Sequence, residues 1–232
     1  MQTAESLGSY DHLVKTGAPM AVRVDLNISL DGFATTTDQT PDNPFGDDWP
    51  RLVGAYASTR TFRERVMHDM SGEGSTGVDD AYARAYFTNI GAEIMGAGMF
   101  GFHSNLEDPN WQGWWGDQPP FECPVFVLTN RVPRPSLELS GTSFHFISTT
   151  PEAALKLALD AAGSRDVRIG GGASVVLDFL KAGLVDQLHV AIAPIVLGQG
   201  RQLWSELRGF ETAFEVTSEI AESGTIHVTF RR

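Results

Sequence analysis

The sequence predicts one mixed α/β domain with a mostly parallel central sheet, flanking helices and a C-terminal antiparallel hairpin. Strand-like and helix-like segments alternate over residues 21–195, which is typical of a parallel sheet covered by helices. The last two apolar segments, 213–220 and 225–232, alternate at period two on either side of a Ser-Gly turn, and this pattern predicts the hairpin. The length of 232 residues suits a single domain over 21–232, which we expect to follow a flexible leader over 1–20.

Composition and charge restrict the partners that the chain can have. The net charge is −12, with 17 basic and 29 acidic residues and no long basic run, so we expect no nucleic-acid partner. No stretch approaches about 18 uninterrupted apolar residues, so we expect no membrane partner. The single cysteine, Cys123, allows no internal disulfide and fits a cytoplasmic location. His103 has no partner at metal-ligand spacing, and we predict no metal site.

The clearest predicted strand covers residues 21–30, where V-R-V-D-L-N-I-S-L alternates apolar with polar side chains. It leads into S-L-D-G at 29–32 and then into a polar loop over 35–50. A helix is predicted over about 50–67, because a proline suits its first turn and Asp48 suits its N-cap.

The middle of the chain contains a tryptophan-rich segment over residues 101–123, with Trp111, Trp114 and Trp115 among glycines, prolines and acids. Three interpretations stay open: a lid or wall of a substrate site, a dimer contact, or a small hydrophobic cluster beneath a long loop. The other elements predicted here are a loop over 69–79, a helix over 80–89, strands over 92–95, 124–128 and 144–147, and a helix over 151–162.

A glycine turn organises the second half of the chain. A short strand over 167–169 leads into Gly170-Gly171-Gly172, and a helix is predicted over 174–181. A glycine turn that opens into a helix exposes backbone N–H groups at the positive end of the helix dipole, where phosphate groups bind. The glycines also fit a tight connection without a ligand, and they do not match G-x-G-x-x-G. A strand over 188–195 and a short helix or turn over 202–209 follow.

Three motifs around this turn are specific: I-G-G-G-A at 169–173, L-K-A-G-L-V-D-Q-L at 180–188 and A-P-I-V-L-G-Q-G at 193–200. Together with S-L-D-G, they resemble the reductase domain of bacterial riboflavin biosynthesis, a member of the dihydrofolate reductase-like superfamily. The resemblance implies a dihydrofolate reductase-like fold, NADPH as cofactor with NADH as the alternative, a small-molecule substrate and a homodimer. The apolar region over 190–196 also favours a dimer interface.

The resemblance further implies where the cofactor binds. The superfamily shows G-R-x-T-[YW] where this chain has Gly96-Ala97-Gly98-Met99-Phe100, so Ala97 replaces the arginine that faces the 2′-phosphate. Arg131 is the best candidate to supply the missing cation, and it also fits a solvent-facing strand end. The implied cofactor-binding residues are Asn27, Ile28 and Ala34 at the nicotinamide, Gly170, Gly171, Gly172, Ala173 and Ser174 at the pyrophosphate, and Gly96, Ala97, Gly98, Thr129, Asn130 and Arg131 around the adenosine.

A reduction also needs a proton, and the loop after the first strand offers carboxyl groups to supply it. Asp31 and Asp48 are the candidate catalytic residues. Trp49, Asp47 and Pro194 are the candidate substrate-binding residues, with Trp49 offering a flat ring to a flat heterocycle. The two adjacent acids also fit solvated helix caps, and Trp49 also fits the core.

The sequence thus predicts an NAD(P)H-dependent reductase that transfers a hydride to a small heterocyclic or carbonyl substrate. No H-x-E and P-C-x-x-C deaminase signature occurs in these residues, which favours a stand-alone reductase. The alternative is a non-catalytic dimer of the same fold that binds or senses a ligand, and Ala97 and Met99 favour it. A bulky residue at Gly171 is expected to abolish cofactor binding and to leave the fold nearly intact.

Overall fold

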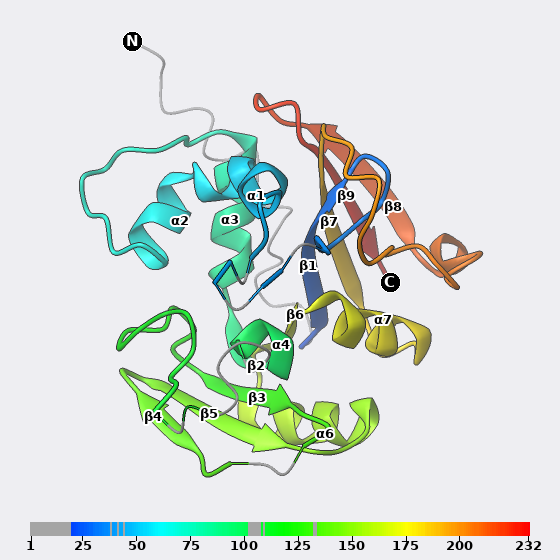
Figure 1. Cartoon of the computed structure of the whole chain (residues 1–232). Coiled ribbons are helices and arrows are strands. Elements are labelled where there is room, and N and C mark those ends of the chain that lie inside the picture. The colour runs from blue at the N-terminus through cyan, green and yellow to red at the C-terminus, as the bar shows by residue number, and fades with distance from the viewer. Residues whose placement is uncertain are drawn as a thin grey trace.

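The chain folds around one nine-stranded sheet in the residues that the computed structural model describes (Figure 1). Met20 is described but the rest of the predicted leader is not, and His103 also lies outside the described residues. The described residues are 20–37, 39–40, 42–43, 45–101, 108, 110–131 and 134–232.

The sheet has the strand order β4-β5-β3-β2-β6-β1-β7-β9-β8. The six strands from β5 to β7 in this order run parallel, while β4, β9 and β8 pair antiparallel at the two edges. This confirms the predicted fold class, including the hairpin. The strands are β1 (Val22–Ser29), β2 (Ile90–Gly96), β3 (Pro124–Leu128), β4 (Leu137–Leu139), β5 (Thr142–Ile147), β6 (Asp166–Gly171), β7 (Gln187–Ala193), β8 (Glu215–Ile220) and β9 (Ile226–Arg231).

Helices cover the two faces of the sheet in different ways. Helices α6 and α7 pack on one face through the main apolar core, which includes Val24, Ile94 and Ile169 of the central strands. Helices α1 and α3 lie over the other face (Figure 1). The helices are α1 (Trp49–Ala57), α2 (Arg60–Arg65), α3 (Val78–Phe87), α4 (Ala97–Phe100), α6 (Pro151–Ala162) and α7 (Ala173–Lys181), with the 3-10 helix η2 (Phe210–Ala213).

The face under α3 is polar at its centre. Side chains alternate along a strand, so the neighbours of the buried valines on β1 are Arg23 and Asp25. On β2 and β6 the same face carries Glu93 and Arg168, which are 0% and 1% exposed and form an ion pair. A row of buried charges therefore crosses the middle of the sheet.

The helix predicted over 50–67 is wrong in one respect, because it is two helices. Thr59 has an extended backbone (φ −70°, ψ 151°) and its hydroxyl accepts a hydrogen bond from the N–H of Phe62, which caps α2. A buried threonine with this local alternative ends α1 and starts α2 at a new angle.

Three further boundaries differ from the sequence prediction. The short edge strand β4 was not predicted, since three residues give too little pattern. The segment 202–209 forms turns, one of its two predicted alternatives, but the 3-10 helix η2 that follows Gly209 (φ +81°) was not predicted. Gly170 and Gly171 belong to β6, so only Gly172 lies between strand and helix.

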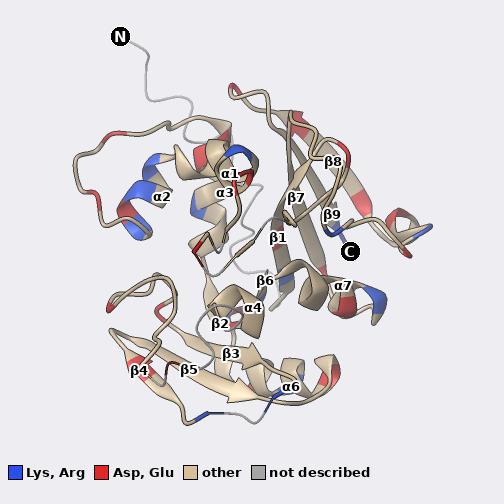
Figure 2. Ribbon diagram, in the orientation of Figure 1, with Lys and Arg blue, Asp and Glu red and all other residues tan. Residues whose placement is uncertain are grey.

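The surface bears on the predicted partners. Lys and Arg gather on α2 and at the end of α7, while Asp and Glu are spread over the molecule (Figure 2). Within the described part of the chain, no helix is long and apolar enough to cross a membrane.

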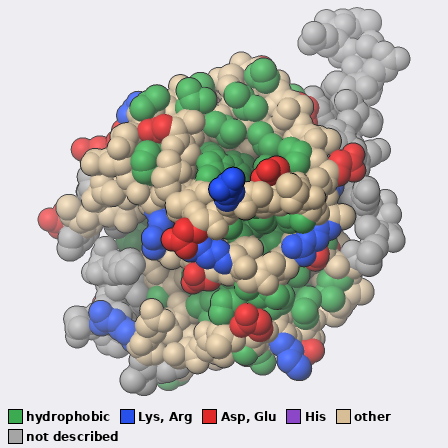
Figure 3. Space-filling model, turned by 90° about the vertical axis from the view of Figure 1, so that its right-hand side faces the viewer, with side chains coloured by type: hydrophobic (Ala, Val, Ile, Leu, Met, Phe, Trp, Pro, Cys, Tyr) green, Lys and Arg blue, Asp and Glu red, His purple; other side chains and the backbone are tan. Residues whose placement is uncertain are grey.

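The apolar region over 190–196 was predicted to favour a dimer interface. Val190 is fully buried, so the core accounts for the start of this region. Apolar side chains lie among charged ones on the face in Figure 3. The homodimer stays a prediction.

Candidate active site

A cavity of about 1150 Å³ lies along the carboxyl ends of the parallel strands. This edge is where open α/β sheets bind ligands. Pockets for one small ligand measure about 300–1,000 Å³, so this cavity has room for a cofactor and a substrate together. Its walls come from the strand ends, from α1 and α3, and from the tryptophan-rich segment, which contributes Trp114 and Trp115.

One end of the cavity has little side-chain bulk. We call it the glycine end and define it as Gly96–Gly98, Gly170–Gly172, Thr129–Arg131 and the first turn of α7. A Cβ atom on Gly96 would lie 2.9 Å from Val175 Cγ2, so the two strand ends approach α7 closely. A Cβ on Gly172 would meet nothing within 4 Å. The Gly171–Gly172 peptide bond is cis. Most of the predicted cofactor residues line this end of the cavity.

Gly171 corrects one expectation from the sequence. Its φ is +128°, a conformation that residues with a side chain rarely adopt, and a Cβ there would lie 3.1 Å from Met99 Sδ. A bulky residue at this position would therefore disturb the fold as well as the cavity. Gly172 has φ −70° and ψ −179°, which any residue can adopt, and is the cleaner position to block.

The first turn of α7 has no side-chain cap for its backbone N–H groups. Gly172 is its N-cap and offers no side-chain hydrogen bond to the free N–H groups of the turn. Arg201 Nη2 donates to Ser174 Oγ at 2.7 Å and brings a positive charge to the same turn. The Arg201 carbonyl accepts from the N–H of Ala34 at 2.9 Å, which ties this loop to the segment after β1. The sequence did not single out Arg201 as a cofactor residue.

Thr129, Asn130 and Arg131 follow β3 at the other side of the glycine end. Thr129 is buried, and its Oγ1 accepts a hydrogen bond from the N–H of Arg131 at 3.1 Å. Arg131 is exposed and lines the cavity. Arg131 and Arg201 are the two cationic residues in the described lining, and both lie at the glycine end.

Two predicted cofactor residues on β1 point to opposite faces of the sheet. Asn27 lines the cavity, as does Ala34 beyond the strand. Ile28 points to the opposite face, where it is 1% exposed in the main core and does not line the cavity. The side chain of Ile28 therefore lies away from the cavity, which does not fit its predicted place at the nicotinamide.

Asp31 holds a loop in place and does not line the cavity. Its carboxylate accepts hydrogen bonds from the N–H groups of Leu197 at 3.1 Å and Gly198 at 2.7 Å. A hydrogen bond with Ser29, aided by these N–H groups, lowers the pKa of Asp31 to about 2. Because its oxygens are bonded to the Leu197–Gly198 loop and it does not line the cavity, the geometry does not support the predicted role of Asp31 as a proton donor.

The two acids before α1 do not line the cavity either. Asp47 is exposed and accepts a hydrogen bond from Asn43, while Asp48 pairs with Arg51 and makes no side-chain cap. Pro194 is exposed and does not line the cavity. Trp49 does line the cavity, with its ring 4.9 Å from that of Phe45.

The tryptophan-rich segment combines two of the three interpretations. Trp111 and Trp115 pack against the hydrophobic cluster around Phe100 and Phe144, and Trp111 Nε1 donates to the Phe100 carbonyl at 2.8 Å. Trp114 lines the cavity beside Phe45, at 4.9 Å between ring centroids. One part of the segment is a satellite core, and the other is a wall of the cavity.

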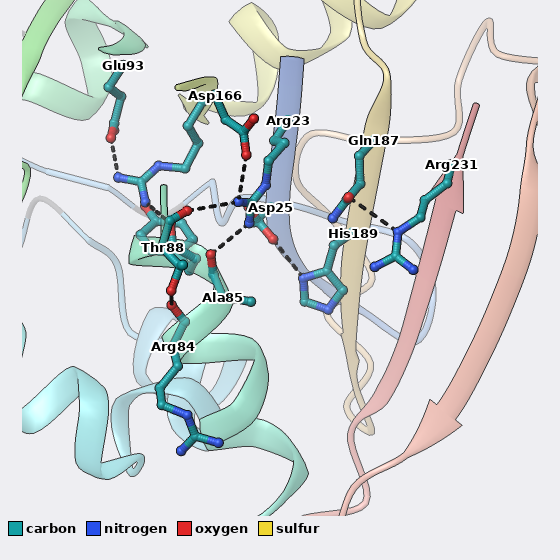
Figure 4. A network of polar contacts seen from close by, with 12 residues as sticks. Arg23, Asp25, Arg84, Ala85, Thr88, Glu93, Asp166, Gln187, His189 and Arg231 are labelled. Carbon is teal, nitrogen blue, oxygen red and sulfur yellow. Dashed lines mark hydrogen bonds and ion pairs between the residues drawn. The ribbon is translucent and has the colours of Figure 1, made fainter. Parts of the chain in front are cut away.

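Sequence reasoning missed a second group of polar residues at the other end of the cavity. We call this group the histidine end and define it as Asp25, Asp79, Tyr82, His189 and His227. These five residues come from β1, α3, β7 and β9 and line the cavity together. Figure 4 shows Asp25 and His189 pointing toward one another from neighbouring strands. The available signal was weak, because Asp25, His189 and His227 take polar positions in strands and Asp79 and Tyr82 lie on a helix.

Charged residues surround this end without an exposed cation. Arg23 Nη2 donates to the Ala85 carbonyl at 2.8 Å, and its Nη1 lies 3.4 Å from Asp166 Oδ2 (Figure 4). Arg168 is paired with Glu93, and its guanidinium lies 3.6 Å from the centre of the Tyr86 ring. No group of three or more His, Cys, Asp or Glu in the described residues is arranged to hold a metal ion.

Comparison with known proteins agrees with this geometry. A family model described as the RibD C-terminal domain matches residues 20–227. The chain belongs to the RibD C-terminal domain family. Membership confirms the resemblance found in the motifs and supports a reductase-type function. A curated relative, the uncharacterized protein YyaP of Bacillus subtilis (strain 168), is 30% identical over 66 residues, which are 28% of this chain and 35% of YyaP.

Solved structures show the fold. A putative riboflavin biosynthesis protein from Shewanella sp. PV-4 aligns with a TM-score of 0.58 and 22% identity, over 92% of this chain and 99% of that chain. The diaminohydroxyphosphoribosylaminopyrimidine deaminase/5-amino-6-(5-phosphoribosylamino)uracil reductase of Thermotoga maritima aligns with a TM-score of 0.50 and 14% identity, over 92% of this chain. The match covers 56% of that second protein. The dihydrofolate reductase-like fold predicted from the motifs is thereby confirmed.

Proposed function

We propose that the protein is an NAD(P)H-dependent reductase of a small heterocyclic or carbonyl compound. The observation that carries the proposal is the glycine end, where a space open at Gly172 adjoins the uncapped first turn of α7 and Arg201. Anionic groups bind at such turns because free N–H groups and the helix dipole face them. The cavity extends from there to a second, aromatic wall.

The residues present fit a nicotinamide dinucleotide. The α7 turn and Arg201 would hold the pyrophosphate, and Arg131 would contact a 2′-phosphate in place of the cation absent at Ala97. Asn27 and Ala34 would flank the nicotinamide at the end of β1. When bound, the cofactor would supply the hydride. The protein orients the reactants in the cavity and keeps water away from them.

The wall formed by α1, α2 and α3 restricts the substrate. Aromatic side chains gather there, and both lining cations lie at the opposite end. A flat, unphosphorylated ring fits this wall, since aromatic faces stack on planar ligands and a phosphate would meet no cation there. In this respect we expect the substrate to differ from the phosphoribosyl compound in the name of the Thermotoga relative. The aromatic residues of the wall are Tyr56, Phe62, Tyr82, Tyr86 and Phe87.

The first experiment is titration of the protein with NADPH and then NADH, followed by nicotinamide fluorescence. We expect micromolar binding by the unchanged protein and at least a hundredfold loss in Gly172→Leu, since the new side chain fills the open space. Gly54→Leu is the matched control, because a Cβ at Gly54 also meets nothing within 4 Å and this residue does not line the cavity. Absence of binding at millimolar cofactor would overturn the proposal.

The second experiment identifies the acceptor. Cofactor oxidation is measured with dihydrofolate, an aminopyrimidine ribosyl phosphate and an unphosphorylated aromatic aldehyde as probes. Preference for the phosphorylated probe would contradict the assignment of the aromatic wall. The non-catalytic alternative is favoured by Met99, whose sulfur lies close to Gly171. It becomes the better account if no cofactor binds.

A further inference from the structure

Four side chains of the histidine end are joined by hydrogen bonds in a line. His189 Nδ1 lies 3.1 Å from Asp25 Oδ1, and His189 Nε2 lies 2.9 Å from His227 Nδ1. His227 Nε2 lies 2.9 Å from Asp79 Oδ1. The line therefore runs from β1 through β7 and β9 to the first turn of α3, with a carboxyl group at each end.

Tyr82 fixes the two rings in one plane. Its ring stacks on His189 at 4.2 Å with an angle of 15° and on His227 at 4.1 Å with an angle of 5°. Its hydroxyl donates to Glu219 Oε1 at 2.8 Å, which holds the tyrosine itself. The imidazoles therefore have little freedom to turn out of the line, and their nitrogen atoms keep facing one another.

The three hydrogen bonds of this line need one proton more than two neutral imidazoles and two carboxylates supply. Each of the three contacts needs one proton between its two heavy atoms. Two neutral imidazoles carry one ring proton each, and two carboxylates carry none. A third proton must be present, because without it one buried contact would place two acceptors against each other, which is unfavourable.

The third proton belongs to the Asp79–His227 contact. Burial raises the pKa of Asp25, but the hydrogen bond with His189 and the charge of Arg23 outweigh it and hold that pKa below its ordinary value. Burial lowers the pKa of His189, against the opposing effect of Asp25. An ionised Asp25 and a neutral His189 direct every hydrogen bond toward Asp25, so the additional proton lies at the far end of the line.

We propose that this four-residue chain stores one transferable proton and delivers it from Asp25 to the substrate. This role rests on the proposed reductase function. Asp25 lines the cavity with 10% of its side chain exposed, and its Oδ2, although buried, accepts no hydrogen bond from the described residues. Asp25 is therefore the member placed to touch the substrate, while His189, His227 and Asp79 are positioning residues.

The transfer balances as one proton moved along the line. The proton at the Asp79 end stays on His227 Nε2 as His227 Nδ1–H gives its proton to His189 Nε2, and His189 Nδ1–H gives its proton to Asp25. The Asp25 carboxyl group then protonates the nitrogen or oxygen of a C=N or C=O bond whose carbon accepts the hydride. After product release, water that enters the cavity returns one proton at Asp25, and the same shifts in reverse restore the Nδ1–H form of both imidazoles with the additional proton at the Asp79–His227 contact.

Other charges face the line and take part in its titration. Arg23 Nη2 lies 3.9 Å from Asp25 Oδ2 and opposes protonation of that carboxyl group. Across the sheet, the opposite charges of Glu93 and Arg168 neutralise each other, and Asp166 forms an ion pair with Arg23. The charged or titratable groups to be considered from each packed element are Arg23 of β1, Glu93 of β2, Asp166 and Arg168 of β6, Glu219 of β8, Arg231 of β9 and Tyr82 of α3.

Asp79→Asn separates proton storage from structure. The amide that this substitution introduces can donate to His227 Nε2, which preserves all three hydrogen bonds with both imidazoles in the Nδ1–H form but leaves no additional proton. The test is ring-nitrogen NMR of the full-length protein labelled with ¹⁵N-histidine, from pH 5 to 9. His189→Phe and His227→Phe keep a ring on Tyr82 and assign the signals. Asp160→Asn is the matched control, since Asp160 is an exposed acid of α6.

The unchanged protein and Asp160→Asn should show Nδ1 protons on both histidines and one titrating proton at the His227 end. Asp79→Asn should keep both Nδ1 protons and lose that titration. Equal titration in all three proteins, or a neutral His189 protonated at Nε2, would overturn the proposal. If the NMR result holds but NADPH does not bind, the proton count stands and the reductase function fails.

A kinetic measurement tests delivery with whichever probe compound is reduced. Asp79→Asn should lower kcat about a hundredfold, in the range of general acid catalysis, with KM unchanged and with the pH dependence of kcat altered. Asp79→Glu should restore part of the rate. Unchanged kcat in Asp79→Asn would contradict the chain even where cofactor binding and reduction are intact.

Discussion

The two ends of the cavity are built by opposite means. The glycine end is made by leaving side chains out, so that backbone N–H groups and open space face a ligand. The histidine end is made by burying charged and titratable side chains against one another on the middle of the sheet. The comparison teaches that one end can recognise an anion with almost no side-chain chemistry, whereas the other can hold a proton only through a complete set of partners.

The largest expected effect comes from breaking the buried charges next to the histidine end. Glu93→Leu would leave Arg168 charged and unpaired in the core, and we expect the free energy of unfolding to fall by about 3–5 kcal/mol. Urea unfolding measures this loss. The double variant Glu93→Leu/Arg168→Met should recover most of it, because no uncompensated charge remains. Equal instability of the single and double variants would show that packing, and not charge, governs this face.

A smaller effect should distinguish the two cations of the glycine end. Arg131→Met should weaken NADPH binding about ten- to hundredfold, the range for a charge-assisted hydrogen bond, and leave NADH binding nearly unchanged. Arg201→Met should weaken both cofactors alike, because this residue adjoins the α7 turn. The measurement is the fluorescence titration with each cofactor. An equal loss for both cofactors in Arg131→Met would remove Arg131 from the 2′-phosphate.

The smallest effect concerns the loop that carries Arg201. The pKa of Asp31 is lowered to about 2, so its contribution to stability is complete above its ordinary value of 3.8 and is lost as the pH falls toward 2. Unfolding of the unchanged protein should therefore become easier between pH 4 and pH 2. Asp31→Asn should show a shallower dependence over the same interval. Identical curves would mean that the loop is held without this carboxylate.

The glycine end could be predicted from the sequence because its determinants are local. A glycine run between a strand and a helix limits the backbone within a few residues, and the motifs around it are specific. Alternation also placed β1 and the final hairpin correctly. The resemblance placed both Asn27 and Ile28 at the nicotinamide, whereas in the structure Asn27 lines the cavity and Ile28 lies in the main core.

The histidine end could not be predicted, because its contacts are long-range. Asp25 and His189 are 164 residues apart, and Asp79 and His227 are 148 apart. Nothing near either histidine indicates an acid partner until the strand order is known. Asp31 and Asp48 were preferred as proton donors because they follow recognisable motifs, yet the structure commits them to the Leu197–Gly198 loop and to Arg51.

Gly170 is where the glycine end meets the buried charges of the sheet, because a Cβ atom there would fall on Glu93 Oε1. The absence of a side chain at one position thus depends on the size of a side chain 77 places earlier in the chain. Across related sequences, the two positions should covary: a small residue at 93 would free position 170 to carry alanine, and a long acid at 93 would confine it to glycine. Redesign of the cofactor site would therefore have to change these two positions together.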